Sequence, residues 1–565
     1  MNPSALPRRT VLATGAAGAA VLPVVARTPA LAQADRRVFA HGIASGDPKP
    51  HAVVIWTRVT PTPAATPGSG QGPNVTVRWE VATDAAFRRV VRRGGFSTGP
   101  SRDHTVKVDV TGLKPATWYH YRFTYDGAPS RVGRTRTAPG RRATPKHLRF
   151  GVVSCANLQA GWFSAYRHLA QRDDLHAVLH LGDYLYEYAP GEYGFGQSNE
   201  DIRPHDPPRE MVSIADYRRR HAQYKTDPDL QDLHAKYPWI ITWDDHEVTN
   251  DQWRNGAENH EPDEGDYKVR RARAHRAYDE WMPLRMDGTA DLRDGTRLFR
   301  RLSFGKLAEI SMLDLRTYRD QQVATPAPPA PFPDGEVSDP ERTILGKKQF
   351  DWLRTSLMQT RSQWKIIGNP VMIAPVNFGA LPDDVIQPIN DVTGLVPEDG
   401  APYNTDQWDG YTADRRQVFR RIDNRGISDV LFVTGDIHSG WACELPLDAS
   451  DYVYENSARK SVGVEFVCSS VTSNNLKDIT GDPSGVTSTA IEEGIKANNR
   501  HIRYLNFDDH GYSVLDINAK RAQMDWFIIG DRSDRDTGAT WETSWQTRSG
   551  TSRIEQVDQP LGGTR

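Results

Sequence analysis

Residues 239–247 read Trp-Ile-Ile-Thr-Trp-Asp-Asp-His-Glu, so an apolar run leads directly into three acids and a histidine. Such a run is typical of a buried strand in a parallel sheet that ends in polar side chains. In open α/β sheets, ligands bind at the carboxyl ends of the strands. This stretch therefore predicts an α/β fold and one edge of a functional site.

The same arrangement occurs three more times along the chain. Residues 148–153 precede Ser154-Cys155, residues 177–181 precede Gly182-Asp183-Tyr184-Leu185-Tyr186, and residues 430–434 precede Gly435-Asp436-Ile437-His438. One such cluster is common and could be a turn or a satisfied core pair. Four of them predict that carboxylates, imidazoles, a thiolate and a phenolate meet at one point.

Four of these side chains are the carboxylates of Asp183, Asp244, Asp245 and Asp436. Buried carboxylates keep a proton or pair with positive charge, and a multivalent metal ion supplies that charge. Two metal ions about 3.5–4 Å apart, bridged by a carboxylate and a hydroxide, form a common clamp for hydrolysis of phosphate esters. The pattern therefore predicts a metal-dependent hydrolase in which the hydroxide attacks phosphorus.

The N-terminal residues 1–34 are typical of an exported precursor. Arg8-Arg9 precede an uncharged Ala/Val/Gly-rich run, and Ala30-Leu31-Ala32 offers a small-residue cleavage site. This layout predicts a twin-arginine signal peptide, so that the mature protein is secreted, periplasmic or at the cell surface. The alternative is an uncleaved anchor, for which the apolar run is short and rich in glycine.

Composition narrows the class of protein. The chain has 565 residues, with 70 Lys+Arg against 72 Asp+Glu and only 3 Cys. The charge balance gives no sign of a nucleic-acid groove, and the cysteine count excludes a fold built on disulfides. We expect a monomer whose partners are the export machinery and phosphate-ester substrates.

The chain divides into two main parts. Residues 38–138 hold short alternating strands and a loop, Gly112 to Tyr119, that looks like the tyrosine corner of a fibronectin- or immunoglobulin-like β-sandwich. Residues 148–530 alternate apolar runs with helical patterns and form the predicted catalytic domain. Helices are expected at 162–171, 214–225, 267–281 and 347–360. Residues 531–565 are expected to pack near the catalytic domain.

The four clusters resemble the calcineurin-like metallophosphoesterase pattern, in the form that PhoD-type alkaline phosphatases use. Residues 243–248 (Trp-Asp-Asp-His-Glu-Val), 435–439 (Gly-Asp-Ile-His-Ser) and 217–225 are similar to that family. The general pattern has Asp-x-His where this chain has Cys155, Asn where it has Asp245, and His where it has Asp436. The resemblance implies an α/β fold with a central β-sandwich flanked by helices, preceded by the small all-β domain.

The resemblance also implies the ligands of two kinds of metal. A ferric ion, Fe³⁺, is implied at Cys155, Asp183, Tyr186, Asp436 and His438. Tyr186 is preferred to Tyr184 and Tyr188 because the family spacing is Asp-x-x-Tyr. Calcium, Ca²⁺, is implied at Asp245 and Asp244, because oxygen-rich sites suit it. Asn250 and Asn369 are further candidates.

Three side chains carry expectations with alternatives. His246 is expected beside the metals and Asp245, as a donor to the phosphate or leaving group, or else as a structural histidine. Arg203 matches the phosphate-clamping arginine of the family, or else is an exposed loop arginine. Cys155 is expected to bind metal, or else to be a buried thiol. Cys443 and Cys468 are then left to pair in an oxidising compartment.

The function implied is an exported phosphatase that cleaves phosphomonoesters and phosphodiesters at alkaline pH. Small organophosphates, phospholipids and teichoic-acid-like diesters are the candidate substrates. One alternative is a phospholipase D-like phosphodiesterase on the same scaffold. Another is a non-catalytic surface protein with structural calcium, which a cysteine, tyrosine and histidine ligand set fits poorly.

Overall fold

The computed structural model describes residues 37–192, 202–286, 297–324, 334–378, 401–449 and 461–561. Residues 34–565 form one compact unit. The predicted signal peptide, residues 1–34, lies outside the described residues and stays a prediction. Among the described helices, none has the length and apolar character needed to cross a membrane.

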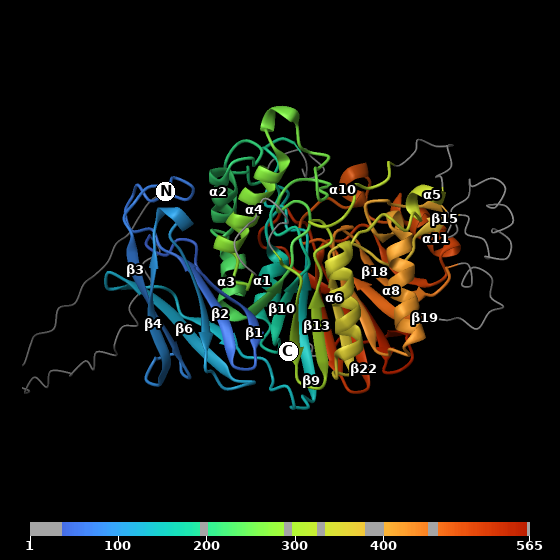
Figure 1. Cartoon of the computed structure of the whole chain (residues 1–565), viewed down its shortest axis with the longest axis horizontal. Helices are drawn as coiled ribbons and strands as arrows, with labels where there is room; N and C mark the ends of the chain where they lie inside the picture. The colour runs from blue at the N-terminus through green and yellow to red at the C-terminus, as the bar shows by residue number, and fades with distance from the viewer. Residues whose placement is uncertain are drawn as a thin grey trace, which may run out of the picture. The chain divides into compact units, whose positions relative to one another are not determined.

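The larger of two central sheets has ten strands in the order β24-β23-β22-β21-β9-β10-β11-β1-β2-β5 (Figure 1). Strands β9, β10, β11 and β1 run parallel to one another, and the others pair antiparallel. The bounds are β1 (Ile43–Lys49), β2 (Ala52–Arg58), β5 (Thr105–Thr111), β9 (His147–Val153), β10 (Ala177–His180), β11 (Pro238–Ile241), β21 (Gly511–Asn518), β22 (Arg521–Ile529), β23 (Ala539–Arg548) and β24 (Ile554–Val557).

The second central sheet has seven strands in the order β12-β13-β14-β17-β19-β18-β20. Its strands are β12 (Arg300–Phe304), β13 (Ala308–Met312), β14 (Trp364–Asn369), β17 (Val430–Thr434), β18 (Gly440–Pro446), β19 (Ser461–Val467) and β20 (Ile502–Asn506). The two sheets pack face to face around one apolar core, to which Phe150 and Leu179 contribute from the larger sheet and Ile366 and Leu431 from the smaller. The predicted β-sandwich is confirmed.

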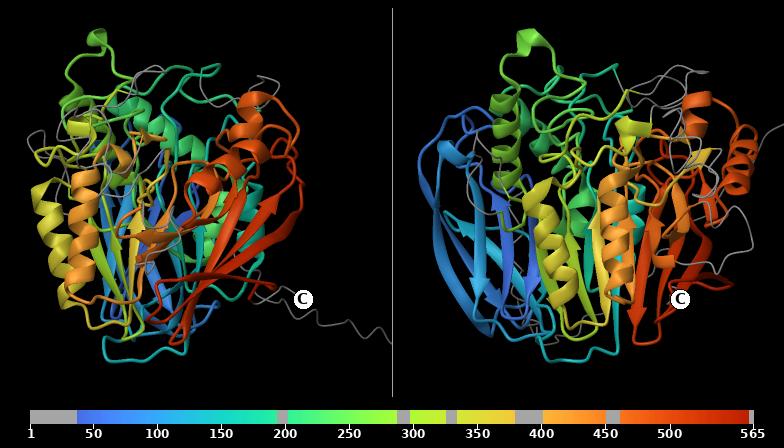
Figure 2. Two further views of the ribbon diagram at one scale, coloured as in Figure 1. Left: turned by 90° about the vertical axis from the view of Figure 1, so that its right-hand side faces the viewer. Right: turned by 45° about the vertical axis from the view of Figure 1, so that its right-hand side comes forward.

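Helices cover both outer faces of this sandwich. Helices α1 to α4 share a buried core with the ten-stranded sheet, whereas α6 and α8 pack on the seven-stranded sheet (Figure 2). The bounds are α1 (Ser164–Gln171), α2 (Ile214–Tyr224), α3 (Pro228–Lys236), α4 (Tyr267–Trp281), α5 (Asp334–Val337), α6 (Gly346–Gln359), α8 (Thr412–Asn424), α10 (Leu476–Thr480) and α11 (Ser488–Asn498). The four predicted helices are α1, α2, α4 and α6.

Local sequence explains where these helices begin. Ser213 and Asp216 form a capping box at α2, in which the Ser213 hydroxyl accepts from the Asp216 amide and the Asp216 carboxylate accepts from the Ser213 amide. Asp227 caps α3 by accepting from the Leu230 amide at 2.8 Å, with Pro228 at the first helical position.

The N-terminal β-sandwich shares a sheet with the rest of the chain. Its outer sheet is formed by β4 (Val90–Thr98), β3 (Val75–Ala82), β6 (Trp118–Tyr125), β7 (Ala128–Pro129) and β8 (Gly133–Arg136). Its inner sheet, β1, β2 and β5, continues the ten-stranded sheet because β1 pairs parallel with β11. The predicted tyrosine corner is present: the Lys114 amide donates to the Tyr119 hydroxyl at 2.9 Å.

The C-terminal segment is likewise part of a sheet. Residues 539–548 and 554–557 form β23 and β24, which extend the ten-stranded sheet beyond β22. The expectation that residues 531–565 pack near the catalytic domain was therefore too loose, because their strands are continuous with it.

Cys443 and Cys468 are both buried and free. Cys443 belongs to the core between the seven-stranded sheet and its helices, whereas Cys468 belongs to the core between the two sheets. The disulfide that the sequence left open is absent, because the sheet separates the two thiols.

Several buried histidines make stability depend on pH. Burial holds the pKa values of His41, His221, His234 and His275 well below the ordinary 6.5. Unfolding restores the ordinary pKa, so below pH 6.5 the unfolded chain binds more protons and stability is lost as pH falls. We expect the free energy of unfolding to fall by about 1.4 kcal/mol per pH unit for each histidine that stays neutral. Urea unfolding at pH 7.5, 6.5 and 5.5 measures this.

His221→Phe provides the control for this prediction. Both ring nitrogens of His221 lack a hydrogen-bond partner, and the ring stacks on Trp281. The variant is expected to remove one group's share of the pH dependence while keeping the packing. An identical dependence in wild type and variant would contradict the assignment.

Candidate metal centre

The four predicted strand ends meet at one edge of the sandwich. Strands β9, β10 and β11 lie side by side in the larger sheet, and β17 comes from the smaller one. Ligand atoms of Cys155, Asp183 and His438 lie within 4.8 Å of one another. So do those of a second group, Asp183, Asp244, Asp245 and Asp436. Asp183 belongs to both groups and so stands where a bridging carboxylate is expected.

The backbone at this edge adopts an uncommon conformation. Cys155, Asp183, Asp436 and His438 have φ angles of 58°, 55°, 67° and 54°, in the left-handed region that side chains with a Cβ rarely occupy. Such residues cost about 1–3 kcal/mol each and persist where the surrounding structure holds them. Left-handed backbone at four candidate ligands turns each strand end sharply and directs its side chain into the common site.

Tyr186 joins the first ligand group, as the spacing rule predicted. Its hydroxyl donates to Asp183 Oδ2 at 3.1 Å and lies 3.2 Å from His438 Nε2. Tyr184 points elsewhere, because its hydroxyl contacts Lys225 Nζ at 2.7 Å and His234 Nε2 at 2.9 Å.

The first group has the features of a prepared ligand set. The Nδ1 of His438 contacts the Asn474 carbonyl at 2.7 Å, which makes Nε2 the nitrogen available for a metal. The Oδ1 of Asp183 is buried without a hydrogen-bond partner. Burial raises the pKa values of the Cys155 thiol and of Asp183 well above their ordinary values. A bound cation would supply the compensating charge that these groups lack.

A buried carboxylate, Glu247, holds two of the strand ends together. It accepts from the backbone amides of Asp183 at 3.1 Å, Tyr184 at 2.7 Å and Asp244 at 2.8 Å. Glu247 thus fixes the relative position of the loops after β10 and β11, and with them the two ligand groups.

The sequence analysis missed Arg316, the buried cation of the second group. Its guanidinium makes a bidentate pair with Asp244, with Nη2 at 2.9 Å from Oδ2, and lies 3.2 Å from Asp436 Oδ1. It also contacts Asp406 at 2.7 Å. Burial would raise the pKa of Asp406, but Arg316 and Arg319 hold it below the ordinary range. Residues 308–316 repeat the same pattern, a strand followed by polar residues, and that signal could have identified Arg316.

Both carboxylate oxygens of Asp244 are thus engaged by Arg316. The structure brings Asp244 into the acidic group, as the sequence predicted, but it gives Asp244 a protein partner that Asp245 lacks at that distance: the closest Arg316 approach to Asp245 is 3.6 Å. Asp245 remains the better candidate ligand of the two.

His246 lies beside the ligand groups. One of its ring nitrogens is within 4.8 Å of Asp183 and Asp245, and its Nδ1 lies 2.7 Å from Glu187 Oε2. Burial would lower the pKa of His246, but Glu187, Asp245 and Asp183 together hold it well above the ordinary value. Glu187, which the sequence analysis did not single out, fixes the ring through Nδ1 and leaves Nε2 for a further contact.

Three other candidates make different contacts. The Arg203 guanidinium pairs with Asp227, the cap of α3, and donates to the carbonyls of Leu158 and Gly161. This arrangement does not support its predicted role as a phosphate clamp. Asn369 donates to the Val371 carbonyl and accepts from Trp408, so it is engaged within the core rather than in a ligand group. The Asn250 amide donates to Glu258 at 3.0 Å.

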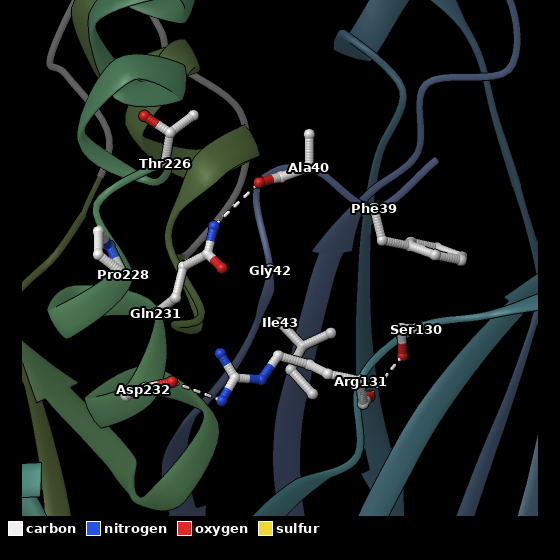
Figure 3. Close-up of a pocket in the computed structure, with 10 residues that line it drawn as sticks. All are labelled: Phe39, Ala40, Gly42, Ile43, Ser130, Arg131, Thr226, Pro228, Gln231 and Asp232. Atoms are coloured by element: carbon white, nitrogen blue, oxygen red, sulfur yellow. Dashed lines mark hydrogen bonds and ion pairs between the residues drawn. The ribbon is translucent and has the colours of Figure 1, made fainter. Parts of the chain in front are cut away.

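A separate cavity lies away from this edge (Figure 3). It measures about 490 Å³ and lies between residues 39–43, residues 130–131 and α3. None of its lining residues belongs to either ligand group, and its main polar groups are paired: Arg131 with Asp232 at 2.7 Å and the Gln231 amide with the Ala40 carbonyl at 2.9 Å. It is a seam between the N-terminal sandwich and α3.

Comparisons with known proteins agree with this site. A family model described as PhoD-like phosphatase matches residues 150–526, and its N-terminal domain model matches residues 25–139. "Alkaline phosphatase D" of Bacillus subtilis (strain 168) is 36% identical over 492 residues, which cover 87% of this chain and 77% of that protein. A solved "Structure of PhoD" has a TM-score of 0.79 and 33% identity, and covers 94% of each chain. The chain therefore belongs to the PhoD-like phosphatase family and is a phosphatase.

Proposed function

We propose that the protein is an exported, metal-dependent phosphatase that hydrolyses phosphomonoesters and phosphodiesters at alkaline pH. The observation that carries this proposal is the pair of ligand groups that share Asp183 at the carboxyl ends of the strands. Metal-dependent phosphoester hydrolysis commonly uses two adjacent ions with a shared carboxylate. Membership of a phosphatase family supports the reaction class.

The two donor sets suit different ions. Cys155, Tyr186, His438 and Asp183 offer a thiol, a phenol, an imidazole and a carboxylate, a mixture that favours a transition metal, and we propose Fe³⁺. Asp183, Asp244, Asp245 and Asp436 offer only oxygen, which suits Ca²⁺. When bound, the ions would activate a water molecule as nucleophile and neutralise charge on the phosphoryl oxygens.

The chain's own residues prepare this chemistry. Glu247 fixes the spacing of the loops after β10 and β11. Arg316 neutralises part of the acidic group and orients Asp244 and Asp436. His246, held by Glu187, is the proton donor that we assign to the phosphoryl oxygen or the leaving group.

Export through the twin-arginine route is part of the proposal and is supported by residues 1–34 alone. The product would then act outside the cytoplasm, in the periplasm, at the cell surface or in the medium, on small organophosphates or on larger diesters such as phospholipids and teichoic-acid-like polymers. A monomer suffices for this function, because one chain contributes both ligand groups.

The test is hydrolysis of a chromogenic phosphomonoester and the matching diester by natively exported protein, from neutral to alkaline pH. The assay is run with EDTA, with added Ca²⁺, and with metal analysis of the same sample. We expect turnover that EDTA abolishes and Ca²⁺ restores, with about one iron per chain.

The other outcomes separate the alternatives. A strong preference for the diester would favour a phospholipase D-like phosphodiesterase. Folded protein that holds no metal and hydrolyses neither ester would overturn the proposed function and leave a binding protein.

A further inference from the structure

The loop after β19, residues 472–474, contacts three of the residues in the first ligand group. The amides of Thr472 and Ser473 donate to the Cys155 carbonyl at 3.3 and 3.2 Å. The Ser473 hydroxyl contacts the Tyr186 hydroxyl at 2.6 Å. The Asn474 carbonyl lies 2.7 Å from His438 Nδ1. The position of this loop therefore sets the orientation of the thiol, the phenol and the imidazole together.

One arginine from the C-terminal segment holds this loop. The guanidinium of Arg532 donates to the Thr472 carbonyl through Nη1 and to Asn474 Oδ1 at 2.7 Å through Nη2. The backbone carbonyl of Arg532 accepts from the Trp162 amide at 2.8 Å, seven residues after Cys155. Arg532 thus connects the loop after β9 to the loop after β19.

Arg532 is itself fixed on its other side. Its Nη1 lies 3.0 Å from Asp478 Oδ2, and the side chain is only 5% exposed. His510 lies between Asp478, at 2.7 Å, and the Ser470 hydroxyl, at 2.8 Å. The Ser470 side chain is fully buried and also contacts the Ser473 carbonyl, so this serine, histidine and aspartate serve as a scaffold for the loop rather than as a nucleophile and base.

We propose that Arg532 is a positioning residue of the metal centre, so that the C-terminal segment completes the ligand group of Cys155, Tyr186 and His438. Arg532 lies beyond residues 150–526, the part matched by the catalytic family model. Partners that orient metal ligands typically contribute about 10–100-fold to metal affinity or activity. Removing Arg532 leaves the ligands in the chain and loosens the loop that orients them. The proposal rests on the proposed metal site.

Metal affinity tests it directly. The metal-free full-length protein is titrated with Co²⁺, whose thiolate charge-transfer band reports binding by Cys155, in competition with a chelator. We expect Arg532→Met to weaken Co²⁺ binding by about 10–100-fold and to alter the band, with partial recovery in Arg532→Lys. Asn474→Ala removes one acceptor of Arg532 and is expected to act in the same direction with a smaller effect.

Arg535→Met is the matched control. Arg535 lies in the same segment and is exposed, with its guanidinium 5.1 Å from the Trp162 ring. It should bind Co²⁺ as wild type does. Urea unfolding of each metal-free variant checks the fold, and Asn474→Ala carries the test if Arg532→Met does not fold.

The possible failures are distinguishable. Wild-type protein that binds no Co²⁺ through Cys155 would overturn the proposed metal site, and this inference with it. Wild-type binding with an unchanged affinity and spectrum in Arg532→Met and Asn474→Ala would overturn the role of Arg532 alone.

Discussion

Asp183→Asn is expected to abolish hydrolysis of both esters and to lower the metal content of the protein. Asp183 is the one residue common to both candidate ligand groups, and its buried Oδ1 has no hydrogen-bond partner. An amide oxygen is a neutral and weaker ligand, so the substitution weakens both ions together. Metal ions contribute several kcal/mol to such reactions, which corresponds to a loss of kcat/KM of about 10³-fold or more.

The measurement combines kcat/KM with metal analysis of the same preparation. Cys155→Ala, which removes a donor from the first group alone, is expected to lower iron content while calcium is retained. Asp525→Asn is the control: Asp525 is equally buried, but it lies in β22 and contacts Ser544 at 2.7 Å and Gln523 at 2.8 Å. Full activity with full iron and calcium in Asp183→Asn would show that the two groups do not form the metal centre.

Arg316→Met is expected to lower the free energy of unfolding of the metal-free protein by about 3–5 kcal/mol. The Arg316 guanidinium is fully buried and lies against Asp244, Asp406 and Asp436. Methionine occupies a similar volume but leaves these carboxylates without their buried counter-charge. The cost therefore comes from uncompensated charge rather than from a cavity.

Calcium should recover part of this loss. Because an ion that binds only the folded state stabilises it, and the variant's acidic group has lost a competing cation, added Ca²⁺ is expected to stabilise Arg316→Met more than wild type. Urea unfolding in EDTA and in Ca²⁺ measures both effects.

Two further variants control for this result. Arg316→Lys keeps the charge but loses the bidentate geometry, and should lie between the other two proteins. Arg548→Met removes an exposed pair with Glu555, whose side chain is 45% exposed, and should change stability by no more than about 1 kcal/mol. A loss in Arg316→Met no larger than in Arg548→Met would show that Arg316 does not neutralise the acidic group.

The strand ends were predictable because their signal is local. A run of apolar residues that ends in Asp, His or Cys is visible in the sequence, and the parallel sheet brings such ends to one edge whatever the loops do. Cys155, Asp183, Asp245, Asp436 and His438 were found in this way. Tyr186 required the family spacing, because Tyr184 and Tyr188 satisfy the local pattern equally well.

The contacts between distant segments were not predictable in the same way. The expected clamp Arg203 pairs with the cap of α3, and the missed cation Arg316 lies 72 residues from Asp244 and 120 from Asp436. Pairs of this kind depend on which loops the fold brings together, and a charged residue in a loop carries no local sign of its partner.

The sequence by itself determined the fold class, the four strand ends and most of the candidate ligands, because apolar periodicity and residue type act over a few residues. Only the tertiary structure decided that β1 joins the N-terminal sandwich to the ten-stranded sheet, that a sheet separates Cys443 from Cys468, and that Arg316 and Arg532 reach the metal centre. These outcomes depend on packing and on buried charge compensation between residues far apart in the chain, and such contacts exist only once the sheets and loops have come together.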